Sequence, residues 1–238
     1  MFTVKIADIA IGIENRYSYV YEISKDYLTE DTPVFTVSAD SSDIEEEKRL
    51  SDVSFAEPLF EATAIYRKIA DNLADYDAFV FHGAVVELDG DAYLFTAKSG
   101  VGKTTHVKLW LDLFPGRARI LNGDKPVIRL INGKPYVSGT PWRGKEGFGY
   151  PGLASLSGIA FLERSKENYA DAEKPESALI KFATQAHIPR SNSTRSAKAL
   201  SLFDKILRSV PLVRLRCNMD ISAAETAYSA FNESKENN

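Results

Sequence analysis

A glycine-rich hexapeptide, Ser99-Gly-Val-Gly-Lys-Thr104, is the feature that most constrains the fold of this chain. The apolar segment Ala92–Thr96 before it has the composition of a strand, and the apolar residues of Val107–Leu113 after it continue as a helix. A strand that passes through a glycine-rich turn into a helix is the setting that a phosphate-binding loop requires. Successive backbone N–H groups in such a turn, together with the positive end of the helix dipole, bind a polyphosphate. The hexapeptide therefore predicts a nucleotide-binding α/β protein.

Each residue of this loop has an expected role. Gly100 and Gly102 let the backbone approach the phosphates without side chains in the way. Lys103 is expected to contact the β- and γ-phosphate oxygens, and the Thr104 hydroxyl is placed to coordinate Mg²⁺. Ala97 occupies a position where the full pattern has glycine, and an extended backbone at the strand end would accommodate it. The predicted phosphate-binding residues are Ser99, Gly100, Val101, Gly102, Lys103, Thr104 and Thr105.

The composition indicates a folded protein without a strong field of either charge. Hydrophobic residues make up 44% of the 238 residues and charged residues 26%, with a formal net charge of −4. This charge argues against a general nucleic-acid or anionic membrane partner. Asp8 interrupts the apolar run that a signal peptide needs, and no run of about 18 apolar residues occurs. Together with the single cysteine, Cys217, these features lead us to expect a cytoplasmic protein.

The pattern divides the chain into two regions. Residues 1–57 are expected to form an N-terminal β-rich appendage, with strands at Phe2–Ile6, Tyr17–Ile23 and Val34–Val37 between polar turns. Residues 58–238 are expected to form the main P-loop domain. We expect a helix at the start of this domain, because the apolar residues there are three or four positions apart in the sequence. Those residues are Ala62, Ile65, Tyr66, Ile69, Ala70 and Leu73.

The main region alternates strands with helices and contains two hairpin signals, Asp89-Gly90 and Asn132-Gly133. We expect an α/β fold with a mixed, largely antiparallel sheet. The expected elements are strand Phe79–Leu88, strands Pro126–Ile131 and Tyr136–Val137, a glycine-rich loop Gly139–Gly152, strand Ile159–Leu162, helices Glu176–His187 and Ser196–Val210, strand Leu212–Arg216 and helix Ser222–Phe231.

The residues around the phosphate loop resemble the HPr kinase/phosphorylase-like P-loop family, whose core is similar to that of phosphoenolpyruvate carboxykinase. The resemblance is carried by His82-Gly-Ala-Val-Val, the Asp89-Gly90 hairpin, the hexapeptide, and Val210–Cys217 before an alanine-rich helix. It spans about residues 79–231. It implies a mixed sheet that carries the loop, and Mg²⁺-dependent transfer of a phosphoryl group from ATP to a hydroxyl.

The same resemblance implies further site residues. Asp124 matches the second of two family aspartates, whereas Gly123 replaces the first, so that one carboxylate must hold Mg²⁺ or accept the acceptor's proton. His82 matches a family histidine that faces the phosphates. Its role stays open between orienting Asp124, contacting the transferred group and binding a second cation.

Another candidate constellation is the glycine-rich stretch Gly139–Gly149. Such a loop can close over phosphates and place a cation on the transition-state charge, for which Arg143 and Lys145 are the candidates. Trp142 could pack on a nucleotide base or on the protein. In contrast, we expect His106 and Lys108 to be packing or surface residues.

Three functions remain open at this point. The first is an ATP-dependent kinase with a hydroxyl acceptor on a protein, peptide or small metabolite, and a homo-oligomer is possible. The second is a nucleotide-binding regulatory module without turnover, which Gly123 favours. The third is a carboxykinase-like activity. The residues do not decide between ATP, GTP and pyrophosphate.

Overall fold

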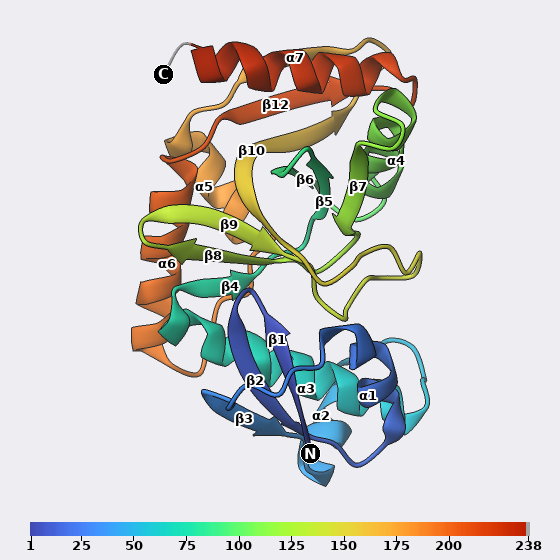
Figure 1. Ribbon diagram of the computed structural model, residues 1–238, viewed down its shortest axis with the longest axis vertical. Helices are drawn as coiled ribbons and strands as arrows, with labels where there is room; N and C mark the ends of the chain where they lie inside the picture. Colours follow the sequence, from blue (N-terminus) through green and yellow to red (C-terminus); the bar gives the residue numbers. More distant parts are fainter. Residues whose placement is uncertain (237–238) are drawn as a thin grey trace.

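The computed structural model describes residues 1–236 and contains two β-sheets with helices packed against them (Figure 1). The strands are β1 (Phe2–Ile6), β2 (Ile9–Glu14), β3 (Phe35–Ser38), β4 (Ala78–Val80), β5 (Ala84–Leu88), β6 (Asp91–Thr96), β7 (Ala118–Asn122), β8 (Val127–Ile131), β9 (Lys134–Ser138), β10 (Leu153–Arg164), β11 (Tyr169–Ala172) and β12 (Leu212–Cys217). The helices are α1 (Ser18–Ser24), η1 (Lys25–Tyr27), α2 (Ser41–Leu50), α3 (Glu57–Leu73), η2 (Ala74–Tyr76), α4 (Lys103–Leu113), α5 (Pro175–Ala183), α6 (Ser193–Leu207) and α7 (Ser222–Glu236).

The small sheet has the strand order β1-β2-β3. β1 and β2 pair antiparallel across Ala7-Asp8, and both turn residues have positive φ, as a two-residue hairpin with the right twist requires. β3 joins β2 in parallel. The predicted strands at Phe2–Ile6 and Val34–Val37 are thus confirmed with small shifts, while β2 was not predicted.

The predicted strand Tyr17–Ile23 is wrong, because this segment forms α1. Its buried side chains, Val20 and Ser24, are four residues apart, and buried Tyr27 follows three residues later. This spacing places them on one helical face, so tertiary packing overrides the strand preference of the tyrosines. With α1 and α2 beside the strands, residues 1–57 are a mixed α/β region rather than a β-rich one.

Helix α3 connects the small sheet to the large one (Figure 1). The predicted apolar stripe is confirmed, since Ile65, Ile69 and Leu73 are fully buried. They share one hydrophobic cluster with strands β1 and β2 and with Val80 and Val127 of the large sheet. Preceding α3, helix α2 begins at a capping box made by Asp40 and Asp43.

The large sheet has nine strands, with the order β4-β8-β9-β10-β6-β5-β7 and with β12 and β11 attached beside β10. Only the pairs β10–β6 and β10–β12 are parallel, and the other pairs are antiparallel. The start of the 12-residue strand β10 pairs with β9 and its end pairs with β12, while β6 occupies the opposite edge. The α/β class with a mixed, largely antiparallel sheet is confirmed at this level.

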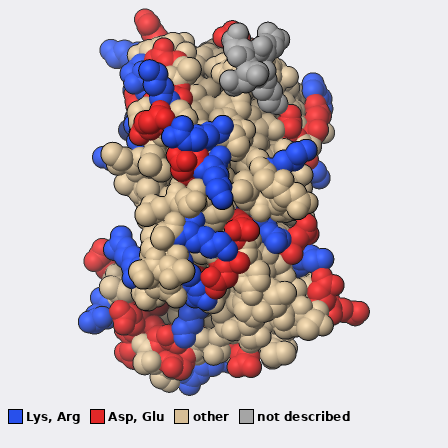
Figure 2. Space-filling model, turned by 90° about the vertical axis from the view of Figure 1, so that its left-hand side faces the viewer, with Lys and Arg blue, Asp and Glu red and all other residues tan. Residues whose placement is uncertain are grey.

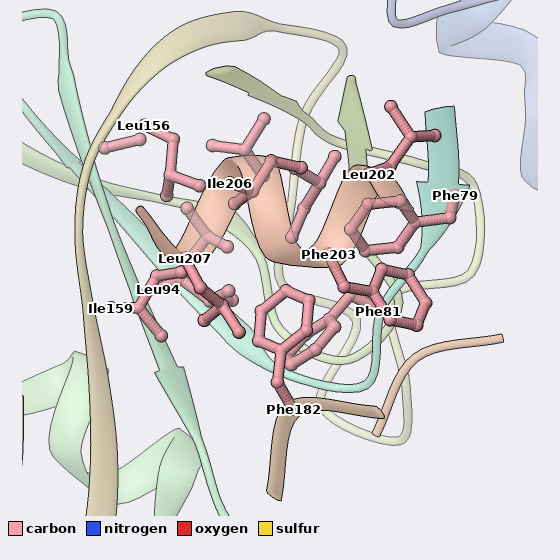
Figure 3. Close-up of a cluster of buried hydrophobic side chains, with 14 of the residues drawn as sticks. Phe79, Phe81, Leu94, Leu156, Ile159, Phe182, Leu202, Phe203, Ile206 and Leu207 are labelled. Atoms are coloured by element: carbon pink, nitrogen blue, oxygen red, sulfur yellow. The ribbon is translucent and has the colours of Figure 1, made fainter. Parts of the chain in front are cut away.

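Helices cover both faces of the large sheet. Side chains on one face of strands β5, β6 and β10 pack on α5 and α6, as Figure 3 shows for Leu94, Ile159 and the α6 residues Leu202, Phe203 and Ile206. Alternate side chains of the same strands pack on α4 and α7. Both predicted hairpins are confirmed, since the turn residues at 89–90 and 132–133 have positive φ.

The predicted strand Phe79–Leu88 is interrupted, and this departure matters for the site. The chain leaves β4 at Phe81 and enters β5 at Ala84, because the two halves pair with different neighbours. The backbone N–H groups in the gap donate to carbonyls outside the sheet: Phe81 to Pro126, His82 to Gln185 and Gly83 to Asp124. His82 therefore lies at a crossing between strands rather than within one.

Ion pairs at the surface join α6 to the chain around η2. Figure 2 shows basic and acidic side chains interspersed over the face that includes α6, without a broad area of one sign. On α6, Arg195 pairs with Asp75 at 2.6 Å and Lys198 with Asp77 at 3.3 Å, which ties α6 to the chain around η2. Within the described residues, no helix is both long and apolar enough to span a bilayer.

Candidate functional site

The phosphate-loop motif lies between β6 and α4, as predicted. β6 ends at Thr96 and α4 begins at Lys103 with Gly102 as its N-cap. Gly100 and Gly102 have φ values of +78° and +123°, and a Cβ on either would meet nothing within 4 Å. The glycines are therefore required by the backbone conformation and not by lack of space. Ser99 and Gly100 are exposed, whereas Val101, Gly102, Thr104 and Thr105 are half-buried.

Lys103 folds back across its own loop. Its Nζ donates to the carbonyl oxygen of Ala97 at 3.0 Å, and the residue is 8% exposed. Burial lowers the pKa of Lys103, and Lys125 lowers it further, whereas the Asp124 carboxylate opposes this shift. Among the described residues, the ammonium group forms no ion pair, which is the electrostatic state expected of a lysine that receives phosphate oxygens.

Arg164 at the end of β10 contacts the loop from the neighbouring strand. Its Nη2 donates to the carbonyl oxygen of Gly100, and its Nε donates to that of Val101 at 3.3 Å. Through these bonds, the carbonyl oxygens of Gly100 and Val101 point toward the Arg164 guanidinium. Sequence reasoning missed Arg164, because only the parallel pairing of β10 with β6 brings residue 164 beside residue 100.

Asp124 is held by a turn that Asn122 organises. The Asn122 side chain is fully buried, and its Oδ1 accepts hydrogen bonds from the backbone N–H groups of Asp124 and Lys125 at 2.9 and 2.7 Å. Its Nδ2 donates to the carbonyl oxygen of Thr140 at 3.2 Å. The turn places the Asp124 carboxylate 3.0 Å from Lys125 Nζ. Asn122 could have been noticed as an Asx-turn residue after a strand, but Lys125 has no distinguishing sequence signal.

His82 and Asp124 are brought together by the crossing between β4 and β5. His82 Nε2 lies 3.4 Å from Asp124 Oδ1, and the Gly83 N–H donates to the Asp124 carbonyl. Burial lowers the pKa of His82, and Lys125 and Lys103 lower it further, while Asp124 and Gln185 oppose the shift. His82 is therefore mainly neutral at pH 7, and its contact with Asp124 is polar rather than an ion pair.

Gly123 lies where the related pattern has a second carboxylate. A Cβ at this position would be 3.3 Å from the Arg143 carbonyl oxygen and 3.4 Å from that of Phe148. The glycine-rich loop covers this side of the turn, and the Gly123 N–H donates to the Phe148 carbonyl at 3.0 Å. A side chain at residue 123 would therefore be in tight contact with the backbone of the loop.

The glycine-rich loop connects the N-terminal region to α4. Arg143 Nη2 pairs with Asp26 at 2.7 Å, and its guanidinium lies 5.5 Å from the centre of the Tyr27 ring. At the other end of the loop, Glu146 pairs with Lys108 of α4 at 3.0 Å. Arg143 is thus engaged with η1, whereas Lys145 is exposed and forms no ion pair within the described part of the chain.

A cleft of about 930 Å³ opens beside Asp124 and Lys125. One wall is the stretch Pro141–Gly147 of the glycine-rich loop, and the other walls come from α1, α2, α3 and the segment between α2 and α3. Trp142 packs in this cleft against Tyr66 of α3, with ring centres 5.3 Å apart. Burial raises the pKa of Tyr66, and the negative charge of the Asp124 carboxylate raises it further. The Tyr66 phenol therefore lies close enough to Asp124 to be affected by its charge.

The candidate magnesium ligands fit the cation in their chemistry. The Thr104 hydroxyl has no hydrogen-bond partner among residues 1–236, and Asp124 supplies a carboxylate. Mg²⁺ prefers such oxygen ligands and usually takes one or two from the protein, with phosphate and water completing the shell. Within that same range, no group of three or more His, Cys, Asp or Glu side chains is arranged to hold a metal by itself.

No protein-family model matches the sequence, and no curated protein matches it. Among solved structures, this chain is similar to the Hpr(Ser) kinase/phosphatase from Coxiella burnetii, with a TM-score of 0.39 and 8% sequence identity. The similarity covers 66% of this chain and 97% of that chain. A TM-score of this size assigns neither a family nor an activity, so the function must be judged from the site's own residues.

Proposed function

We propose that this protein transfers the γ-phosphoryl group of ATP to a hydroxyl, using the loop before α4 and Mg²⁺. The observation that carries the proposal is the convergence of Lys103, Asp124 and His82. Lys103 follows a glycine-rich loop at a helix N-terminus, His82 Nε2 lies 3.4 Å from Asp124 Oδ1, and the Asp124 carboxylate opposes the lowering of the Lys103 pKa by burial. Phosphoryl transfer needs a polyphosphate-binding loop, a cation beside the transferred group and a carboxylate near the acceptor. The loop before α4, Lys103 and Asp124 are the candidates for these three roles.

In this proposal the loop amides and Lys103 bind the β- and γ-phosphates, for which Lys103 Nζ leaves the Ala97 carbonyl. Thr104 and Asp124 would hold Mg²⁺, which neutralises charge on the transferred group when bound. The Asp124 oxygen that faces His82 is the candidate acceptor of the hydroxyl proton, with neutral His82 orienting it. Lys125 and Lys145 are the cations that would meet developing charge, since Arg143 is paired with Asp26.

The first test is nucleotide binding through Lys103. Saturating Mg-ATP at a hundredfold its Kd should stabilise the protein by about 2.7 kcal/mol, measured by thermal or urea unfolding. Lys103→Ala should abolish this stabilisation, because the phosphates lose their buried cation. Lys98→Ala is the matched control, since Lys98 is an exposed lysine of the same loop. Full stabilisation of the Lys103→Ala variant would remove the phosphate-loop assignment.

A second test addresses transfer. Purified protein is incubated with Mg-ATP and hydroxyl acceptors (serine, sugars and short serine-containing peptides), and ADP release is measured. Asp124→Asn should keep at least some nucleotide binding and lose acceptor-dependent ADP release by at least about a hundredfold, in line with the loss of a general base. Equal ADP release by wild type and Asp124→Asn would exclude Asp124 as base or metal ligand.

A nucleotide-binding module without turnover is the second candidate. The observation that favours it is Gly123, because this residue supplies no carboxylate and a side chain here would crowd the carbonyls of the glycine-rich loop. A single carboxylate then has to serve both Mg²⁺ and the acceptor proton. Tight Mg-ATP binding without ADP release for any acceptor would favour this module over the kinase.

A further inference from the structure

We propose that the cleft beside Asp124 binds the phosphoryl acceptor, and that this acceptor is an uncharged small molecule with its hydroxyl next to a bulky apolar or aromatic group. This inference rests on the proposed function, because it names the substrate of that site. Its first support is location. Asp124 and Lys125 form part of the cleft wall, so a molecule bound in the cleft reaches the carboxylate that would take its proton.

The lining of the cleft supplies the apolar character. Aromatic side chains converge on it from three parts of the chain: α1, the segment before α3 together with α3 itself, and the glycine-rich loop. Trp142 and Tyr66 are in ring contact, and so are Phe55 and Phe60, whose ring centres are 6.0 Å apart. The aromatic and aliphatic lining residues are Tyr19, Ile23, Leu50, Phe55, Leu59 and Phe60 with Tyr66 and Trp142.

The charges of the cleft argue for a neutral ligand. Asp26 pairs with Arg143, Glu47 pairs with Arg67 at 2.5 Å, Asp124 pairs with Lys125, and Glu22 pairs with Lys25 at 2.6 Å. Of the charged lining residues in the described range, this leaves only Lys145, which is exposed to solvent. A cationic ligand would have to break a pair or remain uncompensated in a partly desolvated site, and an anionic ligand would find only this solvent-exposed lysine unpaired. An uncharged ligand leaves every pair intact.

The size of the cleft favours a small molecule over an extended chain. Its volume of about 930 Å³ is within the range of about 300–1,000 Å³ that small-molecule sites occupy, and such sites are mainly apolar with a few polar groups. Free serine or glycerol would fill only a small part of this space. An acceptor with an aromatic or branched body would bury the exposed rings of Phe55 and Tyr19, which are 51% and 39% exposed.

The test uses three probes with the same primary hydroxyl. N-acetylserine benzylamide is uncharged and has an apolar body, N-acetylserine methylamide is uncharged and small, and free serine is charged. Binding is followed by tryptophan fluorescence, because one of the two tryptophans, Trp142, lines the cleft and the other, Trp110, is fully buried elsewhere. Trp142→Phe is the control that should lose the response. We expect the benzylamide to bind at least tenfold more tightly than the other two.

Variants at the rim locate the binding site. Phe55→Ser should weaken benzylamide binding about tenfold through lost apolar contact and leave Mg-ATP binding unchanged. Ile180→Ser on α5 is the matched control, since Ile180 is also an exposed apolar residue and is 75% exposed. Both variants are expected to fold, because each replaces a solvent-exposed side chain.

Three results would overturn the inference. They are equal or tighter binding of free serine or of the methylamide, tighter binding of a polar peptide such as acetyl-Gly-Gly-Ser-Gly-Gly-amide, and benzylamide binding that never stimulates ADP release although another acceptor does. A failure of the proposed function looks different. In that case Mg-ATP binding would not depend on Lys103, or no acceptor would release ADP, whatever the cleft binds.

Discussion

At the scale of single residues, two buried polar side chains, Asn122 and His106, make hydrogen bonds that fix the structure around them. Asn122 is fully buried and holds the backbone of both Asp124 and Lys125. His106, one turn into α4, is 2% exposed and accepts a hydrogen bond from Trp110 Nε1 at 3.3 Å. This position confirms the expectation that His106 is a packing residue.

His106 should make the stability depend on pH. Burial lowers its pKa from the ordinary 6.5 to about 4, so the unfolded chain binds the proton more tightly. The free energy of unfolding should therefore be highest above pH 6.5 and fall as the pH drops from 6.5 to 4, by about 3 kcal/mol from this residue.

The measurement is urea unfolding of the wild type and of His106→Gln at several pH values between 7 and 4. Glutamine keeps a hydrogen-bond acceptor near Trp110 but does not titrate. The difference in unfolding free energy between the two proteins should shrink as the pH falls. Two curves that stay parallel over this range would show that His106 is not held neutral by burial.

At the scale of elements, the glycine-rich loop between β9 and β10 decides how the site is assembled. It closes over Gly123, contacts α4 through Glu146 and reaches η1 through Arg143. Three of its glycines have positive φ, but their surroundings differ. A Cβ on Gly144 would lie 2.8 Å from the Asp124 Cβ, whereas a Cβ on Gly147 would meet nothing within 4 Å.

This difference gives a matched pair of variants, Gly144→Ala and Gly147→Ala. Their φ values, +73° and +69°, are alike, so the backbone conformation should cost each variant about 1 kcal/mol of unfolding free energy, and Gly144→Ala should lose more because its Cβ meets the Asp124 Cβ. Only Gly144→Ala should also displace Asp124, and we expect its acceptor-dependent ADP release to fall at least about tenfold more. Equal losses of turnover in the two variants would contradict a fixed position of Asp124 against this loop.

At the scale of the whole molecule, the N-terminal region and the large sheet share a core. The cluster around α3 contains Ile11 of the small sheet and Val80 and Val127 of the large one. Arg129 Nη1 on β8 also donates to the Ala7 carbonyl at 2.7 Å, which joins the two sheets. The division at residue 57 stays a prediction from sequence, and this shared core supplies a way to test it.

We predict that the two regions unfold in one transition. The two tryptophans report on different parts, since Trp110 lies in the core between the sheet, α4 and α7, and Trp142 packs against the cluster around α3. Urea unfolding of Trp110→Phe and Trp142→Phe, each corrected for its own stability by circular dichroism, should give coincident fluorescence and circular dichroism midpoints within each variant. A separate, earlier transition for Trp142 would show that residues 1–57 and α3 unfold independently.

The sequence by itself determined the elements whose signals are local. The glycine-rich loop before α4, the two hairpin turns and the stripe of α3 were predictable, because backbone conformation and side-chain period are properties of adjacent residues. The sequence also indicated His82 and Asp124 as site candidates, through resemblance.

The tertiary structure alone decided which distant residues meet. It broke the expected strand at His82, turned Tyr17–Ile23 into a helix, and paired Arg143 with Asp26 across 117 positions of sequence. It also brought Arg164 to the loop before α4 and formed the cleft between the N-terminal region and the stretch Pro141–Gly147. Such contacts depend on the order of strands in the sheet and on which apolar faces pack together. Neither can be predicted from the spacing of apolar residues or from the turn residues of a single segment.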